Sequence, residues 1–178
     1  HHANLISAFM GDGSKWGVKI DYSLEKKPLG TIGPLTIIKN LPETFLVMNG
    51  DILCNLDYKD FVSSHTNKNN QISVAVHKRE TKIDFGVLKY NANNYLTEFQ
   101  EKPNFTFDVS MGVYCFQRSA IEGLPKGKSY GFDNLMIDKI KQKENVWVYP
   151  FDGFWLDIGR PSDYEYAHEN YSHIKKLL

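Results

Sequence analysis

Short apolar runs rich in β-branched and aromatic residues alternate with helical patterns along this chain, and this alternation limits the fold more than any other feature. The apolar runs occupy residues 44–54, 71–77, 109–116 and 146–149. Runs of this length and composition predict strands that are buried on both faces. Strands that alternate with helices indicate an α/β domain, Rossmann-like in layout, with a mostly parallel sheet flanked by helices.

Three segments carry the helical pattern. Residues 58–68 and 132–143 place apolar side chains at helical spacing, and residues 161–178 open with Pro161, which suits a first helical turn. No internal repeat, low-complexity tract or linker interrupts the chain. Residues 1–178 are therefore predicted to form one domain.

One segment departs from this alternation. Residues 84–100 contain two β-rich stretches around Asn91-Ala92-Asn93-Asn94, a sequence typical of a turn. The pattern predicts an inserted β-hairpin that leads directly into Glu101-Lys102-Pro103.

Composition excludes several classes of function. Lys plus Arg number 21 and Asp plus Glu number 21, so no overall charge attracts nucleic acid or a membrane surface. No apolar stretch approaches the roughly 20 residues that span a bilayer. The two cysteines, Cys54 and Cys115, lie in apolar runs and are predicted to be buried thiols of a cytoplasmic protein. His1 and His2 are either native residues or the remnant of a purification tag.

Two aspartates are candidates for a metal site. Asn49-Gly50-Asp51 follows an apolar run, and ligands of α/β sheets bind beyond the carboxyl ends of strands. Gly50 would let a ligand approach the backbone. Asp157 lies between Leu156 and Ile158, where burial of a carboxylate is costly unless it is paired or bound to a metal. The alternatives are a solvated turn aspartate and a loop aspartate before the Pro161 helix.

Further candidates for ligand binding flank these aspartates in sequence. Lys102 could contact a phosphate and Glu101 could accept hydrogen bonds from sugar hydroxyls, although a solvated Glu-Lys pair is the commoner interpretation. In residues 22–35, Gly30 could bring backbone amides close to a base, and Glu25 could hydrogen-bond the edge of the base. The alternative there is a loop followed by a helix that runs to Lys39.

Other chemistries lack their motifs. There is no Gly-Lys-Ser/Thr phosphate loop and no Gly-x-Ser-x-Gly nucleophile elbow. The six histidines and two cysteines show no zinc spacing. Lys and Arg are scattered rather than gathered into a basic surface for nucleic acid.

The order of the motifs resembles that of the nucleotidyltransferases that make nucleoside-diphosphate sugars, such as mannose-1-phosphate guanylyltransferase and glucose-1-phosphate thymidylyltransferase. The similarity runs from about Leu5 to Tyr171. Its motifs are Gly11-Asp12-Gly13-Ser14-Lys15-Trp16-Gly17, Tyr22-Ser23-Leu24-Glu25, Pro28-Leu29-Gly30-Thr31, Asn49-Gly50-Asp51, Phe85-Gly86-Val87, Glu101-Lys102-Pro103, Gly112-Val113-Tyr114 and Trp155-Leu156-Asp157-Ile158-Gly159.

This resemblance implies an activity and a set of roles. A sugar 1-phosphate would attack the α-phosphorus of a nucleoside triphosphate and release pyrophosphate, with GTP and a mannose- or heptose-type sugar favoured. Magnesium would be the cofactor. The implied roles are Asp51 and Asp157 as Mg²⁺ ligands, Lys102 at the sugar phosphate, Glu101 and Gly86 at the sugar hydroxyls, and Glu25 and Gly30 beside the base.

The sequence departs from the family pattern in two places. The signature Gly-Gly-x-Gly-Thr-Arg followed by Pro-Lys-Pro, which grips the triphosphate, is absent. Its absence predicts an N-terminally truncated domain with negligible turnover, and missing strands would expose apolar surface that favours a homo-oligomer. Ser110 replaces the asparagine that many guanylyltransferases carry two residues before Gly-x-Tyr, which leaves the sugar open.

Two alternatives belong to other classes. A non-catalytic sugar-nucleotide-binding or regulatory relative would have no need of the triphosphate loop, but it would also have little need of two metal carboxylates. A glycosyltransferase of related fold would carry Asp-x-Asp at a strand end, and Asn49-Gly50-Asp51 meets that pattern only halfway.

Overall fold

A computed structural model describes residues 2–178, so the interpretation of His1 as part of a tag lies outside the described residues. The chain divides into two compact units. Unit 1 comprises residues 1–43 and 118–145, and unit 2 comprises residues 44–117 and 146–178. Each unit is described by itself below.

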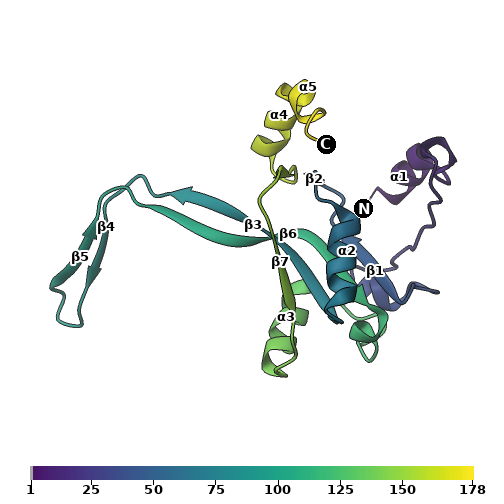
Figure 1. Ribbon diagram of the computed structural model, residues 1–178, viewed down its shortest axis with the longest axis horizontal. Coiled ribbons are helices and arrows are strands. Elements are labelled where there is room, and N and C mark those ends of the chain that lie inside the picture. The colour runs from purple at the N-terminus through teal and green to yellow at the C-terminus, as the bar shows by residue number, and fades with distance from the viewer. Residues whose placement is uncertain (1) are drawn as a thin grey trace. The chain divides into compact units, whose positions relative to one another are not determined.

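A four-stranded sheet forms the body of unit 2, in the order β1–β6–β3–β7 (Figure 1). β6 is antiparallel to both β1 and β3, whereas β3 and β7 are parallel. The α/β class is therefore confirmed. Three strands run in one direction as expected, but the pairing is mixed because β6 returns antiparallel between β1 and β3. The strands are β1 (Thr44–Met48), β3 (Ile72–Lys82), β6 (Asn104–Gln117) and β7 (Trp147–Phe151).

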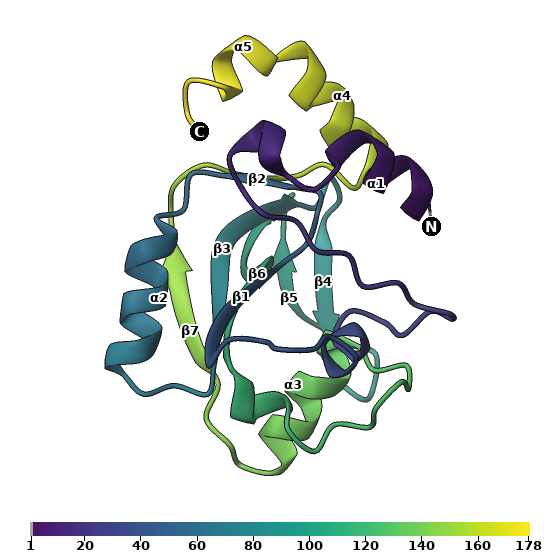
Figure 2. The same cartoon turned by 90° about the vertical axis from the view of Figure 1, so that its right-hand side faces the viewer.

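Helix α2 (Tyr58–Asn67) packs against this sheet (Figure 2). It begins at Asp57, whose carboxylate accepts hydrogen bonds from the backbone N–H groups of Lys59 and Asp60 and so satisfies two free donors of the first turn. Phe61 is fully buried and belongs to a cluster with Met111 and other buried side chains. The predicted helix is confirmed, and it anchors the core of unit 2.

The β3–β6 ladder extends beyond the predicted apolar runs and ends in the hairpin of β4 (Val87–Tyr90) and β5 (Leu96–Gln100) (Figure 1). The predicted hairpin is confirmed, and its turn is closed by a hydrogen bond from Asn94 N–H to Asn91 O, 2.9 Å. The outer ladder pairs polar residues such as Lys78 with Asp108. A search for apolar runs cannot detect such strands, which explains why β3 and β6 are longer than predicted.

Two predicted segments are split in the structure. The run at residues 44–54 breaks at Asn49-Gly50-Asp51 into β1 and β2 (Ile52–Cys54), and β2 pairs antiparallel with β8 (Trp155–Asp157). The helix predicted at residues 161–178 consists of α4 (Pro161–Glu169) and α5 (Tyr171–Ile174), separated at Asn170. Pro161 opens α4 as expected.

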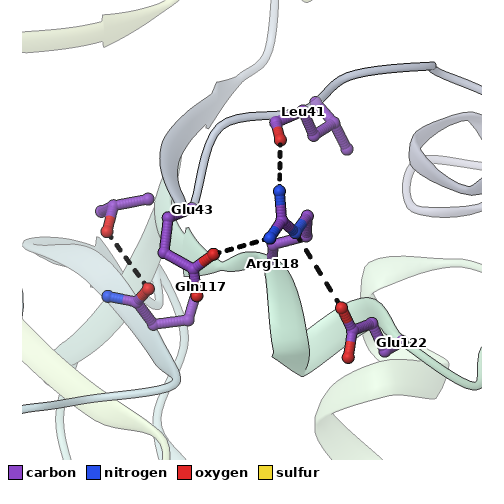
Figure 3. Close-up of polar contacts among 6 residues, drawn as sticks. Leu41, Glu43, Gln117, Arg118 and Glu122 are labelled. Carbon is purple, nitrogen blue, oxygen red and sulfur yellow. Dashed lines mark hydrogen bonds and ion pairs between the residues drawn. The ribbon is translucent and has the colours of Figure 1, made fainter.

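Unit 1 is built from short helices. The segment expected to be a helix up to Lys39 is only a 3-10 turn, η2. Arg118 donates to the Leu41 carbonyl oxygen and to the Glu43 carboxylate, which fastens the chain before β1 to η3 (Figure 3). The elements are α1 (Ala3–Met10), η1 (Ser14–Trp16), η2 (Gly33–Thr36), η3 (Arg118–Ile121) and α3 (Phe132–Lys141), the last of which confirms the helix predicted at residues 132–143. Within residues 2–178, no helix has the length and apolar character needed to cross a membrane.

Candidate functional site

Asp51 and Asp157 lie side by side in unit 2 because of the β2–β8 pair. Asp157 is the register partner of Ile52, the residue that follows Asp51. The backbone N–H of Ile158 donates to the Asp51 carbonyl oxygen at 2.9 Å, which continues the ladder by one bond. Backbone pairing therefore fixes the main chain of both aspartates, and both side chains are half-buried.

The two carboxylates converge at Gly159. A Cβ atom at this glycine would lie 2.9 Å from Asp51 Oδ2 and 3.0 Å from Asp157 Oδ1. The Gly159 backbone N–H also donates to Asp157 Oδ1 at 2.9 Å, which holds one carboxylate in place. Gly159 thus leaves the space in which two acidic oxygens approach each other, and any side chain there would displace at least one of them.

Asn49 and Ser110 shape the neighbouring backbone. The Asn49 N–H donates to the Gly112 carbonyl oxygen at 2.9 Å, and the Asn49 side chain covers the place where Gly112 would carry a Cβ. Gly112 has φ +73°, a conformation that favours glycine, at an irregularity in the β3–β6 ladder. Ser110 Oγ lies 3.1 Å from the Tyr114 hydroxyl across this irregularity. By contrast, Gly50 is exposed, and a Cβ there would meet open space.

Gly86, Glu101 and Lys102 form a second group at the base of the hairpin. A Cβ at Gly86 would lie 3.3 Å from Glu101 Oε2, so the structure brings these two residues together. Glu101 and Lys102 are exposed, and Lys102 has φ +43°. The ladder from Ser110 to Asn104 places six residue steps, about 20 Å at the usual strand rise, between this group and Ser110. The described conformation therefore presents two separate groups within unit 2.

Glu25 and Gly30 belong to unit 1. Glu25 Oε2 accepts a hydrogen bond from the Leu29 N–H at 2.8 Å, so the carboxylate stabilises its own loop. Gly30 has φ +76°, and a Cβ there would lie 2.8 Å from the Tyr130 carbonyl oxygen. The structure thus brings Glu25 next to the Leu29-Gly30 turn and gives both residues a local structural role.

Sequence reasoning did not assign roles to Gly159, Asn49 or Asn55. Gly159 was noted only as part of a motif, yet it sets the spacing of the carboxylates. Asn55 Oδ1 accepts from the Phe154 N–H at 2.8 Å and joins the end of β2 to the loop before β8. The signal available in the sequence was the position of each residue, two or four residues from a candidate aspartate.

Comparison with known proteins identifies the family. A family model described as nucleotidyl transferase matches residues 1–173. The catalytic subunit beta of mannose-1-phosphate guanylyltransferase from Drosophila pseudoobscura pseudoobscura is 30% identical over 159 residues, which cover 86% of this chain and 43% of the relative. Mannose-1-phosphate guanyltransferase beta-B from Xenopus laevis is 29% identical over 179 residues, covering 92% of this chain and 49% of the relative. The chain thus spans less than half the length of these relatives.

Solved structures share the fold. HddC from Yersinia pseudotuberculosis, crystallised in complex with GMP-PN, aligns with a TM-score of 0.68 at 24% identity, covering 95% of this chain and 74% of HddC. A putative glucose-1-phosphate thymidylyltransferase from Bacillus anthracis, in complex with a sucrose, aligns with a TM-score of 0.66 at 21% identity. That alignment covers 94% of this chain and 71% of the thymidylyltransferase.

Proposed function

The chain belongs to the nucleotidyl transferase family, and from this premise we propose that it takes part in nucleotidyl transfer from a nucleoside triphosphate to a sugar 1-phosphate. The observation that carries the proposal is the convergence of the Asp51 and Asp157 carboxylates at Gly159. Two carboxylates that face the same glycine offer a pair of negative charges to a cation. A site that brings anionic phosphates together has use for such a cation.

The donor set fits Mg²⁺. Within residues 2–178 no group of three or more His, Cys, Asp or Glu side chains could hold a metal. Mg²⁺ commonly takes one or two protein carboxylates and fills its other positions with water and substrate phosphates. We therefore assign Asp51 and Asp157 as the residues that would hold Mg²⁺, which would supply charge neutralisation between the two phosphorylated substrates.

The reaction requires positioning more than a protein nucleophile. An oxygen of the sugar 1-phosphate forms a bond to the α-phosphorus, and the bond from that phosphorus to the bridging oxygen of pyrophosphate breaks. By the family resemblance, Lys102 would offset charge on the sugar phosphate, and Glu101 with the Gly86 backbone would bind sugar hydroxyls. These roles require the base of the hairpin to come closer to the carboxylate pair than the roughly 20 Å of strand that separates it from Ser110 in the described conformation. Gly50 and Ser110 would line the approach to Asp51, while Glu25 and Gly30 would contact the base.

The names of the relatives support GTP and mannose 1-phosphate as the first substrates to test, with a heptose-type 1-phosphate second. We place the protein in the cytoplasm, which is supported by two free cysteines, Cys54 and Cys115. Self-association into a homo-oligomer is part of the proposal, as is a single nucleotidyltransferase domain over residues 1–178.

The test measures binding and turnover separately. Calorimetry should show Mg²⁺-dependent binding of mannose 1-phosphate or GDP-mannose to the chain. Binding of equal strength with and without Mg²⁺ would contradict the assignment of Asp51 and Asp157 as metal ligands. Pyrophosphate release from GTP and mannose 1-phosphate should be negligible for the 178-residue chain, because the triphosphate-gripping signature is absent from its sequence. Robust release would show that expectation wrong. Binding that survives in Asp51→Asn/Asp157→Asn would favour a non-catalytic sugar-nucleotide-binding relative.

A further inference from the structure

His77 lies in β3 of unit 2, where it is the register partner of Phe151 in β7. Its side chain is half-buried, and its ring centroid lies 5.5 Å from that of Trp155. Trp155 begins β8, the strand that carries Asp157. Through Trp155, His77 therefore contacts the strand that carries Asp157 rather than the carboxylates themselves.

Both ring nitrogens of His77 face carbonyl oxygens. Nδ1 lies 2.8 Å from the Lys78 carbonyl oxygen, and Nε2 lies 3.1 Å from the Gly153 carbonyl oxygen. A carbonyl oxygen only accepts hydrogen bonds, whereas a neutral imidazole has a single N–H. Whichever nitrogen carries the hydrogen therefore donates to one of these two carbonyl oxygens.

From this geometry we infer that His77, by donating from Nε2 to the Gly153 carbonyl oxygen, clips the loop at residues 152–154 to β3 and acts as a positioning residue for Asp157. The loop has a second fastening: Phe154 N–H donates to Asn55 Oδ1 at 2.8 Å, and Asn55 N–H donates to the Phe154 carbonyl oxygen at 3.2 Å. Because Asn55 follows β2, the clip and this bond pair together set β8 against β2. The link to Asp157 rests on the proposed function, whereas the clip itself does not.

His65 in the same unit shows the opposite arrangement. Its Nε2 lies 3.3 Å from the Gln117 amide nitrogen, a donor, and its Nδ1 lies 2.7 Å from Ser73 Oγ. Gln117 Oε1 accepts from the Thr44 hydroxyl, which assigns the amide orientation. This network needs a neutral ring that accepts at Nε2, so His65 serves as an internal reference for the neutral state.

The charged groups around His77 come from three elements. Lys78 and Arg79 follow it on β3, Asp108 lies on β6, and Asp152 follows β7. Lys78, Asp108 and Asp152 line a hollow together with Val76, and strand alternation directs Val76 and Lys78 to the face opposite His77. Within residues 2–178 no ion pair within 4.0 Å involves His77.

The first test reads the ring nitrogens directly. Long-range ¹⁵N–¹H spectra of the full chain near neutral pH should show hydrogen on Nε2 of His77 and on Nδ1 alone of His65. An Nε2 atom without hydrogen in His77 would overturn the clip. This measurement uses the unaltered chain, so it decides the question even where a variant fails to fold.

The second test removes one donor. His77→Gln should raise amide hydrogen exchange at Phe154 and weaken Mg²⁺ binding about threefold to tenfold, at or below the 10–100-fold typical of groups that directly orient metal ligands. The matched control, His173→Gln at an exposed position in α5, should change neither. Unchanged exchange at Phe154 in His77→Gln would overturn the positioning role. If the unaltered chain binds no Mg²⁺, the proposed function fails, while the exchange data still decide the clip.

Discussion

The carboxylate pair and the hairpin are two regions of the same unit that hold their groups in different ways. Asp51 directly precedes β2 and Asp157 ends β8, two strands joined by backbone hydrogen bonds next to a core in which Phe61 is fully buried. The hairpin is a two-stranded sheet in which Leu88 and Phe99, paired across the strands, are 55% and 56% exposed. Core packing therefore fixes the carboxylate pair, whereas only the pairing of two strands fixes the hairpin.

The largest expected difference is in stability. Phe61→Ala should lower the free energy of unfolding by about 3–5 kcal/mol, because it opens a cavity in the core. Phe99→Ala in the hairpin should cost less than about 1 kcal/mol, because much of the ring is already in water. Urea unfolding followed by circular dichroism measures both. Equal losses of unfolding free energy in the two variants would show that the hairpin is packed in solution and that the two regions do not differ in this way.

The next effect concerns metal binding. Asp51→Asn together with Asp157→Asn should weaken Mg²⁺ binding by about 100-fold or more, since both carboxylates are lost. Asp84→Asn, an exposed aspartate before the hairpin, serves as the control and should leave the affinity unchanged. Calorimetric titration with Mg²⁺ measures this. Unchanged Mg²⁺ affinity in the double variant would show that the metal site does not lie at the β2–β8 pair.

A smaller effect is expected at two glycines near the aspartates, which should respond differently to substitution by alanine. Gly159→Ala should weaken Mg²⁺ binding roughly tenfold, because the new methyl group would press on both carboxylates at about 3 Å. Gly50→Ala meets open space and should change the free energy of unfolding by less than about 0.5 kcal/mol. Unperturbed Mg²⁺ affinity in Gly159→Ala would mean that the carboxylates do not converge there.

The smallest effect is a difference in acid sensitivity between the core of unit 2, where His65 of α2 is buried, and the hairpin. Burial lowers the pKa of His65 from its ordinary value of 6.5. The unfolded chain therefore takes up the proton first, so stability is full above pH 6.5 and declines as the pH falls below it. Unfolding measured as a function of pH should show this decline, and His65→Asn should remove it. An unchanged decline in that variant would assign the effect to another group.

The hairpin should respond in a lower pH range. Hydrogen bonds from Lys89 and Gln100, with the charge of Lys89, lower the pKa of Glu98 from 4.5. The Lys89–Glu98 pair is therefore formed above this value and is lost only as the pH falls below it. NMR chemical shifts of the Lys89 and Glu98 side chains, measured as a function of pH, would follow the loss of this ion pair. Loss of the pair at the same pH as the His65 transition would show that the two regions do not differ in acid sensitivity.

Sequence reasoning captured what local pattern encodes. The helix at α2, the hairpin and the first turn at Pro161 all follow from short-range spacing and turn chemistry, and all are confirmed. Sequence patterns did not predict the outer parts of β3 and β6, because these parts contain polar pairs such as Lys78 with Asp108 and Glu80 with Thr106. Pairing partners, rather than hydrophobicity, make those residues strands.

The candidate site was predictable in its residues but not in its geometry. Asp51 and Asp157 stood out as carboxylates near apolar runs, and the structure brings them together. The roles of Gly159 and Asn55 depend on contacts between segments that are distant in sequence, which no local pattern reports. The roles proposed for the site residues remain predictions, namely those of Asp51, Asp157, Lys102, Glu25, Gly30, Gly50, Gly86, Glu101 and Ser110.

The pairing of β2 with β8 also has a consequence for synthesis. β2 leaves the ribosome well before β8, because most of unit 2 lies between the two strands in the sequence. The two carboxylates therefore cannot meet at Gly159 until most of unit 2 has been translated and folded. A nascent chain that stalls before Trp155 carries Asp51 without Asp157, so the carboxylate pair exists only once the strands that hold it are complete.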